Sequence, residues 1–202
     1  MQASEDLSAK AGVDLDSDGV IVAGGNLALT ALGDARLGGT AAALGEQSVG
    51  NLQVSSGRDL IVKQDGQIQA AGTLTAQALR DLSVAGALTS VQDLMLAAAR
   101  DARVDGTAAS DARLTLTGRN IAVGAAGLTQ AGQTLTATAD ETLLAEGRML
   151  AGISQTLIAG DSMTVNGTVA ALQGDLTLNA LRGDLTMGAA STQQAGETLA
   201  AT

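Results

Sequence analysis

The chain has 202 residues, of which 46% are hydrophobic and 16% charged, with 26 Gly and no Phe, Tyr, Trp, Cys, His or Pro. This aliphatic content argues against intrinsic disorder. The net charge of −10 argues against nucleic acid as a partner, because binding it requires clustered Lys and Arg. No stretch approaches the roughly 18 apolar residues of a membrane-spanning helix, so we expect no membrane insertion.

A short phrase that contains Gly or another turn former recurs about every 20 residues from one end of the chain to the other. Within each copy, apolar residues stand at positions i and i+2, as in Leu114-Thr115-Leu116, which is typical of a short strand with one buried face. The first series of strand starts comprises Leu7, Leu27, Leu52, Leu74, Leu94, Leu114, Leu135, Leu157, Leu176 and Leu199. The second comprises Leu15, Leu60, Leu82, Ala102, Ile121, Leu143, Met163 and Leu185. The third comprises Ile21, Ile68, Leu88, Ala108, Leu128, Leu150 and Val169.

Three short strands in each coil predict an all-β solenoid, a parallel β-helix of roughly triangular section. About nine or ten coils would form a rod some 45 Å long at the spacing of paired strands. One coil cannot bury its apolar face alone, so each coil depends on its neighbours for stability. An all-helical solenoid is the competing class, but the 26 glycines and the period-two pattern argue against it.

Asp14-Leu15-Asp16-Ser17-Asp18-Gly19 matches the first half of a calcium-binding EF-hand loop. The twelfth position of that loop is Gly25, where a bidentate Glu is required. Leu15 also belongs to the second strand series, which predicts that Asp14 and Asp16 point outward and that Asp18 and Gly19 form a turn. We therefore expect no metal site here and no cofactor in the chain.

Two segments fit the period poorly. Between Leu27 and Leu52 the spacing stretches to 25 residues, and residues 38–45 alternate weakly, so we expect a bulged corner or a loop there. Residues 140–146 can also be read as a helical turn, although the strand pattern of the flanking coils favours a strand.

Enzymatic activity is the main alternative of a different class, since a β-helix can carry a catalytic groove. The acid–base candidates Asp101, Asp105 and Asp111 lie on ordinary repeat corners, where Asp is a turn former. Without His or Cys the chain can form neither a Ser/His nor a Cys/His pair, nor the usual zinc site. We therefore expect that this chain is not an enzyme.

Arg182-Gly183-Asp184 is the integrin-recognition tripeptide, in which the Asp carboxylate reaches a metal ion of the receptor and the Arg reaches an acidic groove. The same residues are also a copy of the repeat phrase, because Gly183-Asp184-Leu185 matches Gly174-Asp175-Leu176. A corner position would expose both charged side chains. Both interpretations stay open: a receptor-binding site, or one more turn of the repeat.

The phrases Gly-Asn-Leu-x-Leu-x-Ala at residues 25–31, Gly-Asn-Leu-x-Val at 50–54 and Gly-Arg-Asp-Leu-x-Val at 57–62 resemble the haemagglutinin repeats of the filamentous haemagglutinin family. These are very large two-partner-secreted exoproteins of Gram-negative bacteria, and the resemblance covers essentially the whole chain. It implies a right-handed β-helix, an outer-membrane secretion partner that acts through parts outside this chain, and a location outside the cell or on the bacterial surface. It also implies that residues 1–202 are a single β-helical segment, an interior slice of a longer shaft.

The resemblance implies a structural function, a rigid shaft segment that holds distal adhesive regions of a secreted adhesin away from the cell. The alternatives are direct binding of a host-cell receptor, an integrin, through Arg182, Gly183 and Asp184, or the shaft of a contact-dependent growth-inhibition toxin, which shares these repeats. We also expect unpaired strand edges at the ends of the segment to favour end-to-end self-association.

Overall fold

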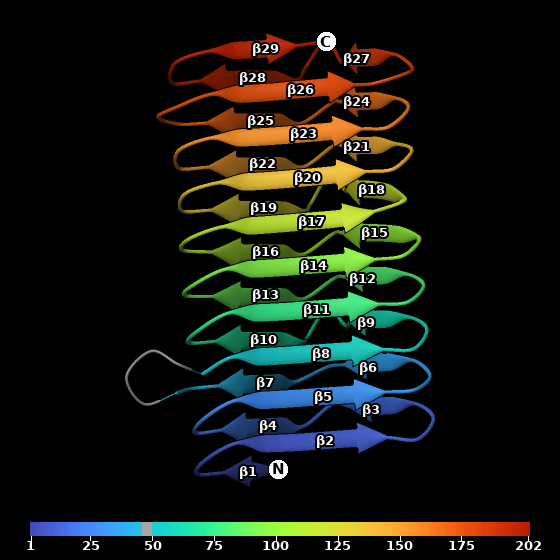
Figure 1. The fold of residues 1–202 in the computed structure, drawn as a ribbon, viewed down its shortest axis with the longest axis vertical. Helices are drawn as coiled ribbons and strands as arrows, with labels where there is room; N and C mark the ends of the chain where they lie inside the picture. Colours follow the sequence, from blue (N-terminus) through green and yellow to red (C-terminus); the bar gives the residue numbers. More distant parts are fainter. Residues whose placement is uncertain (46–49) are drawn as a thin grey trace.

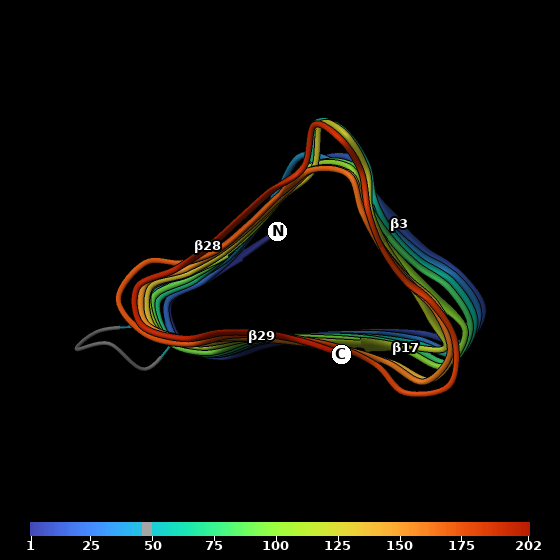
Figure 2. The ribbon, with the colours of Figure 1, turned by 90° about the horizontal axis from the view of Figure 1, so that it is seen from above.

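The computed structural model describes residues 1–45 and 50–202, and these residues form a right-handed parallel β-solenoid of triangular section. Each coil contributes one strand to each of three parallel sheets, and ten strands stack in two of the sheets and nine in the third. Figure 1 shows the coils stacked along one axis, and Figure 2 shows the three flat sides that meet at three corners. Within the described residues no helix is long and apolar enough to cross a bilayer.

The strands are short, and each coil runs through the sheets in the order A, B, C. Sheet A comprises β1 (Gln2–Ala3), β4 (Val20–Ala23), β7 (Thr40–Ala43), β10 (Gln67–Ala70), β13 (Ala87–Ser90), β16 (Thr107–Ser110), β19 (Leu128–Ala131), β22 (Arg148–Ala151), β25 (Thr168–Ala171) and β28 (Thr192–Ala195). Sheet B comprises β2 (Leu7–Ala11), β5 (Leu27–Ala31), β8 (Leu52–Ser56), β11 (Leu74–Ala78), β14 (Leu94–Ala98), β17 (Leu114–Gly118), β20 (Leu135–Ala139), β23 (Gln155–Ala159), β26 (Leu176–Ala180) and β29 (Leu199–Ala201). Sheet C comprises β3 (Leu15–Ser17), β6 (Ala35–Leu37), β9 (Leu60–Val62), β12 (Leu82–Val84), β15 (Asp101–Val104), β18 (Asn120–Val123), β21 (Leu143–Ala145), β24 (Met163–Val165) and β27 (Leu185–Met187).

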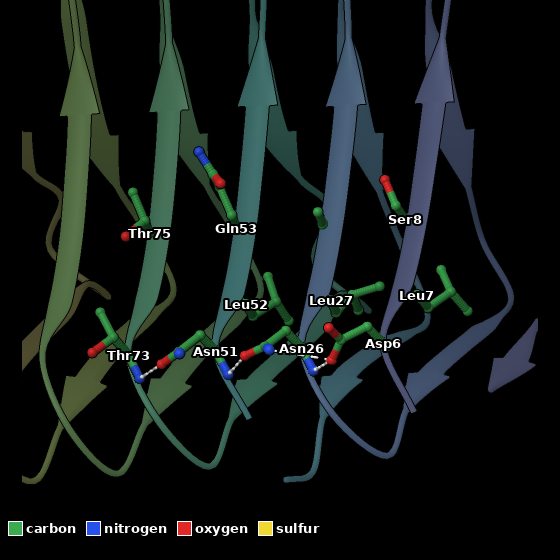
Figure 3. Close-up of a pocket in the computed structure, with 11 residues that line it drawn as sticks. Asp6, Leu7, Ser8, Asn26, Leu27, Asn51, Leu52, Gln53, Thr73 and Thr75 are labelled. Carbon is green, nitrogen blue, oxygen red and sulfur yellow. Dashed lines mark hydrogen bonds between the residues drawn. The ribbon is translucent and has the colours of Figure 1, made fainter. Parts of the chain in front are cut away.

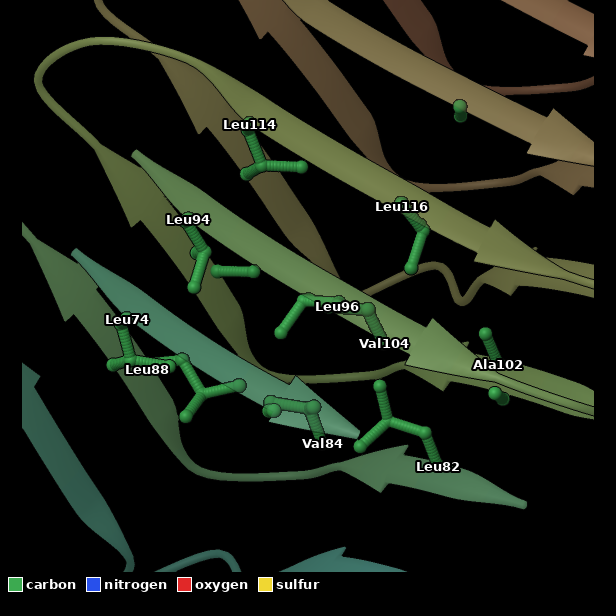
Figure 4. Close-up of a cluster of buried hydrophobic side chains, with 14 of the residues drawn as sticks. Leu74, Leu82, Val84, Leu88, Leu94, Leu96, Ala102, Val104, Leu114 and Leu116 are labelled. Atoms are coloured by element: carbon green, nitrogen blue, oxygen red, sulfur yellow. The ribbon is translucent and has the colours of Figure 1, made fainter. Parts of the chain in front are cut away.

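The core is a column of aliphatic side chains from all three sheets. In β17, Leu114 and Leu116 are buried while Thr115 and Thr117 are partly exposed, because successive side chains of a strand point to opposite faces. Leu74, Leu94 and Leu114 pair in register and lie one above another in Figure 4. The predicted second series pairs in register from Leu15 to Leu185, with Ala35 as an additional member.

Two of the predicted strand series contain errors. The partner of Leu135 and Leu176 in sheet B is Gln155 rather than Leu157. The corners before β20 and β23, residues 132–134 and 152–154, are equal in length, and this equality fixes the pairing. A shift of two residues keeps the same side chains inside, so alternation alone cannot distinguish Leu157 from Gln155 as the strand start.

In sheet A, the inward positions belong to Thr129 and Met149 rather than to Leu128 and Leu150. The corner before β19 has four residues, 124–127, whereas the corner before β16 has only two, 105–106. The backbone N–H of Gly127 donates to the carbonyl of Gly124 within that longer corner, and the strand then starts with Leu128 facing outward. A shift of one residue exchanges the two faces of a strand.

The two irregular segments have different outcomes. Gly38 and Gly39 form a corner in which Gly39 has a φ of +61°, but residues 40–43 are the regular strand β7, so the expectation of a bulge or loop was wrong for them. The additional residues of this coil lie in the connection between β7 and β8. Only residues 44 and 45 of the predicted loop belong to that connection. Residues 46–49 of that connection lie outside the described residues. At 140–146 the strand β21 is present, so the helical alternative was wrong.

Glycines stack at the corner between sheets C and A because the backbone of successive coils approaches closely there. A Cβ atom at Gly106 would lie 2.1 Å from the carbonyl oxygen of Gly86, and one at Gly167 would lie 2.0 Å from that of Gly147. We call this set the glycine column. It comprises Gly66, Gly86, Gly106, Gly127, Gly147 and Gly167. A side chain in the middle of this column must displace the backbone of a neighbouring coil.

Gln155 is a polar residue in the apolar core, and it provides a test of the corrected register. Its side chain is 1% exposed, and neither Oε1 nor Nε2 has a hydrogen-bond partner in the described structure. We expect Gln155→Leu to raise the free energy of unfolding by about 1–3 kcal/mol, because it removes two buried unpaired polar atoms. Urea denaturation measures the change. Gln77→Leu on the outer face is the control and should shift stability by less than about 0.5 kcal/mol. A destabilised Gln155→Leu variant would contradict the assignment.

Candidate functional site

The tripeptide Arg182-Gly183-Asp184 lies at the corner between β26 and β27, and all three residues are exposed. This corner has four residues, 181–184, whereas the equivalent corner one coil earlier has three, 160–162. Figure 2 shows the orange-red traces of the last coils swinging below the line of sheet B at this corner, close to the label β17, whereas the blue traces of the first coils reach further to the right. The tripeptide therefore occupies an exposed corner that is one residue longer than the corner below it.

The side chain of Arg182 is turned back along the rod rather than outward. Its Nε–H donates to the carbonyl of Gly160 at 2.6 Å, and its Nη2 donates to the carbonyl of Asp140 at 3.4 Å. The backbone N–H of Gly183 donates to the carbonyl of Asp161, and the carbonyl of Asp184 accepts from Met163, so the corner is anchored to the coil before it. The tripeptide is therefore a fixed corner in which the Arg guanidinium already has partners.

A shallow cleft of about 350 Å³ borders this corner. Asp140, Ile158, Leu181 and Arg182 line it, so it combines apolar side chains with one carboxylate and one guanidinium. The cleft lies beside the tripeptide on the outer surface of sheet B. It gives the corner a concave neighbour that a protein partner could fill.

A column of carboxylates follows the corner between sheets B and C along the rod, and we call it the aspartate ladder. Asp14, Asp34, Asp59 and Asp81 lie on the corner itself, and Asp101 is the first residue of β15. In each step the backbone N–H of one aspartate donates to the carboxylate of the aspartate one coil earlier. The distances run from 2.8 Å for Asp34 on Asp14 to 3.3 Å for Asp59 on Asp34 and for Asp81 on Asp59. The ladder satisfies corner N–H groups that the sheets leave without a strand partner.

Arginines alternate with the first four aspartates of the ladder and pair with them. Arg58 reaches Asp14 and Asp34, each at 3.1 Å, and so spans three coils. Arg80 pairs with Asp59 through two hydrogen bonds, and Arg100 pairs with Asp81 at 2.8 Å. These guanidinium–carboxylate pairs orient the corner, although ion pairs this exposed contribute little stability one by one.

The aspartate ladder makes stability depend on pH. The hydrogen bond from the Arg80 guanidinium holds the pKa of the Asp59 carboxyl below its usual value. A lowered folded-state pKa stabilises the protein above the ordinary Asp pKa of about 3.9, and the stabilisation disappears as the pH falls through the folded-state value. We expect Asp59→Asn to lower the melting temperature at pH 7 and this deficit to shrink below about pH 4. A deficit that is equal at pH 7 and pH 3 would contradict the pairing with Arg80.

The calcium-like segment at Asp14 faces cations of this chain. Asp14 belongs to the aspartate ladder, and the Lys63 ammonium lies 2.8 Å from Asp16 and 2.6 Å from Asp18. These two carboxylates raise the pKa of Lys63. Among the described residues no group of three acidic side chains is arranged to hold a metal ion. As predicted, Asp16 points outward and Asp18 lies in the connection between β3 and β4.

The acid–base candidates of one coil do not come together. Asp101 is the first residue of β15, next to the corner between sheets B and C, and its carboxylate accepts from the Asn120 amide at 2.9 Å. Asp105 lies at the next corner and pairs with Arg103, while Asp111 lies at the third corner, between β16 and β17. The three carboxylates therefore lie at or beside three different corners of the triangular coil and form no common cluster.

A second ladder, which sequence analysis missed, follows the corner between sheets A and B. Its carboxylate and amide oxygens accept the backbone N–H of the next coil: Asp6 from Asn26 at 2.7 Å, Asn26 from Asn51 at 3.0 Å and Asn51 from Thr73 at 2.9 Å. Figure 3 shows these groups in a row beside a groove of about 660 Å³. The repeated Asn-Leu dipeptide at the start of a strand was the signal that could have revealed it.

No protein-family model, no curated protein and no solved structure matches this chain.

Proposed function

We propose that this chain is a rigid shaft segment of a large secreted bacterial adhesin. The observation that supports this function best is the continuity of the stack. Every sheet runs in register through all its strands, and no coil is interrupted by an inserted domain in the described residues. Each additional coil of such a solenoid lengthens the rod by about 4.8 Å, the spacing of paired strands.

The stiffness of such a rod comes from features that repeat in every coil. Each strand hydrogen-bonds to the equivalent strand on either side, the aliphatic core is continuous, and side-chain ladders join the corners. Bending the rod would open backbone hydrogen bonds and core contacts in several coils at once. These properties suit an element that holds another region at a fixed distance from a surface.

The proposal includes where the shaft acts and what it works with. The repeat phrases resemble those of two-partner-secreted exoproteins, so we place the shaft outside the cell, on or released from a bacterial surface, after passage through an outer-membrane partner. The chain has no cysteine, so no disulfide can form within it while it is unfolded. The regions that the shaft presents would make the contacts with host cells.

Exchanging whole coils tests the spacer function. The secreted parent protein is shortened by removing two, four or six complete coils, and the lost coils are then replaced by duplicates of other coils of this segment. A spacer predicts that adhesion falls with the number of coils removed and recovers with the duplicates, whichever coils are used. Adhesion that depends on the identity of one coil, and not on length, would contradict a spacer.

A second candidate function is direct binding of an integrin through Arg182, Gly183 and Asp184. The form of this corner supports it, because the corner is one residue longer than the equivalent corner one coil earlier and exposes all three residues of the tripeptide. In this function the Asp184 carboxylate would reach the receptor's metal ion, and Arg182 would exchange its carbonyl partners for an acidic groove.

We expect Asp184→Glu to reduce attachment of integrin-bearing cells to the immobilised protein several-fold, since a longer side chain misplaces the carboxylate. Asp175→Glu, in the matching phrase of the same coil, is the control and should leave attachment unchanged. Counting attached cells at equal coating density measures the effect. Equal attachment to the wild type and to Asp184→Glu removes this second candidate and leaves the spacer function in place.

A further inference from the structure

Asn166-Gly167-Thr168 is the one Asn-x-Ser/Thr sequence, with x other than Pro, in the chain. This tripeptide is the acceptor motif for attachment of a sugar to the Asn amide nitrogen. The motif occurs often by chance in protein sequences. It is informative here only if the side chain of its Asn has a different environment from the side chains of the other asparagines.

The other four asparagines of the chain all use their side chains within the structure. Asn26, Asn51 and Asn120 accept backbone N–H groups of the next coil in the corner ladders, and Asn179 accepts from the hydroxyl of Thr202. The side chain of Asn166 has no hydrogen bond to the described residues, and the residue is exposed at the corner between β24 and β25. The single acceptor motif therefore coincides with the single asparagine whose side chain makes no hydrogen bond to the described residues.

The side chain of Asn166 lies against a glycine of the next coil. The equivalent position one coil later is Gly188, and a Cβ atom there would lie 2.4 Å from Oδ1 of Asn166. The absence of a side chain at Gly188 opens the space into which the Asn166 amide extends. The backbone is already satisfied without that amide, because the N–H groups of Asn166 and Gly167 both donate to the carbonyl of Ala145, at 2.8 and 2.9 Å.

We propose that Asn166 is an N-glycosylation site. The sugar donor is an activated sugar diphosphate, carried on a nucleotide or a lipid, and a transferase supplies the catalysis. The amide Nδ2 forms a bond to the anomeric carbon of the sugar, the bond from that carbon to the phosphate oxygen breaks, and the diphosphate leaves with the electron pair while Nδ2 loses one proton. No electron carrier is involved. Thr168 is the hydroxyl residue of the motif and is partly exposed at the start of β25.

A sugar on Nδ2 would break neither a strand pairing nor a core contact, because Asn166 is exposed, lies outside the strands and is not part of the core. The site lies at the corner between sheets C and A, whereas the tripeptide Arg182-Gly183-Asp184 lies between sheets B and C. The proposal does not depend on the proposed function, since it rests on the motif and the side-chain environment of Asn166 alone.

Mass spectrometry of the protein isolated from its native source tests the proposal. Cleavage after Arg148 and Arg182 releases a peptide that contains both Asn166 and Asn179. We expect this peptide to carry the mass of one or more sugar units, and fragmentation to place them on Asn166. An unmodified peptide from the native protein would overturn the proposal, and so would a sugar located on Asn179 or on a hydroxyl residue.

Variants expressed in the native source separate the motif from other modifications. Asn166→Gln and Thr168→Val should lose the sugar completely, whereas Thr168→Ser and Asn179→Gln should keep it. Loss in Thr168→Val with retention in Thr168→Ser identifies the hydroxyl requirement of Asn-linked transfer. A sugar that persists in Asn166→Gln would overturn the assignment even if the wild-type peptide is modified.

Discussion

Leu114→Asp should destabilise the solenoid more than any other single change considered, by more than about 4 kcal/mol. Leu114 is 1% exposed and stacks in register between Leu94 and Leu135 in the middle of the rod. The substitution places a carboxylate among aliphatic side chains that offer it neither a cation nor a hydrogen-bond donor. Because each coil depends on its neighbours, we expect the coils on both sides to lose their structure with it.

Urea denaturation followed by far-ultraviolet circular dichroism measures this effect. Thr115→Asp is the matched control, since it introduces the same side chain into the same strand on the partly exposed outer face. We expect the control to unfold at nearly the wild-type urea concentration. Equal destabilisation by both variants would show that the assignment of inward and outward faces is wrong.

Gly106→Ala has the second-largest expected effect, a loss of about 1–3 kcal/mol or more. The new methyl group would lie 2.1 Å from the carbonyl oxygen of Gly86 and 2.4 Å from that of Ala85, and neither backbone atom can move without disturbing the pairing of β13 with β16. The loss of stability arises because the backbones of two coils approach so closely at Gly106 that no space remains for a Cβ atom.

Gly19→Ala separates this cause from the general effect of replacing a glycine. Gly19 lies at the same corner of an earlier coil, and a Cβ atom there meets nothing within 4 Å. We expect Gly19→Ala to be neutral or slightly stabilising, since Ala restricts the unfolded chain more than Gly does. Similar losses of stability in both variants would mean that contact between coils is not the reason for the glycine column.

The repeated i, i+2 pattern was sufficient to predict the solenoid class, the three strands per coil and every member of the second series except Ala35. It failed where the answer depends on corner length. Gln155 takes the place predicted for Leu157 because the corners of neighbouring coils match in length, and Thr129 is buried because the corner before it is longer. Corner residues do not alternate between apolar and polar, so the sequence pattern does not reveal how long a corner is. The length of each corner has to be known before the strand register can be assigned.

The candidate site was predictable only in part. The exposure of Arg182 and Asp184 follows from their corner position in the repeat. The hydrogen-bond partners of Arg182 could not be predicted in this way. Gly160 and Asp140 are 22 and 42 residues earlier in the sequence, and they come within reach of Arg182 only when three coils are stacked. The same reason explains why the pairing of Arg58 with Asp14, 44 residues apart, was not foreseen.

Distances between spin labels test the solenoid most directly, and the absence of native cysteine allows labels to be placed in pairs. One label replaces Thr75, and the other replaces Thr115, Thr136, Thr156 or Thr177, which all occupy the same register column of sheet B. The stack predicts separations that rise in steps, about 10, 14, 19 and 24 Å, since two to five rungs of about 4.8 Å lie between the labels. Separations that do not increase in this order would contradict the stacked solenoid.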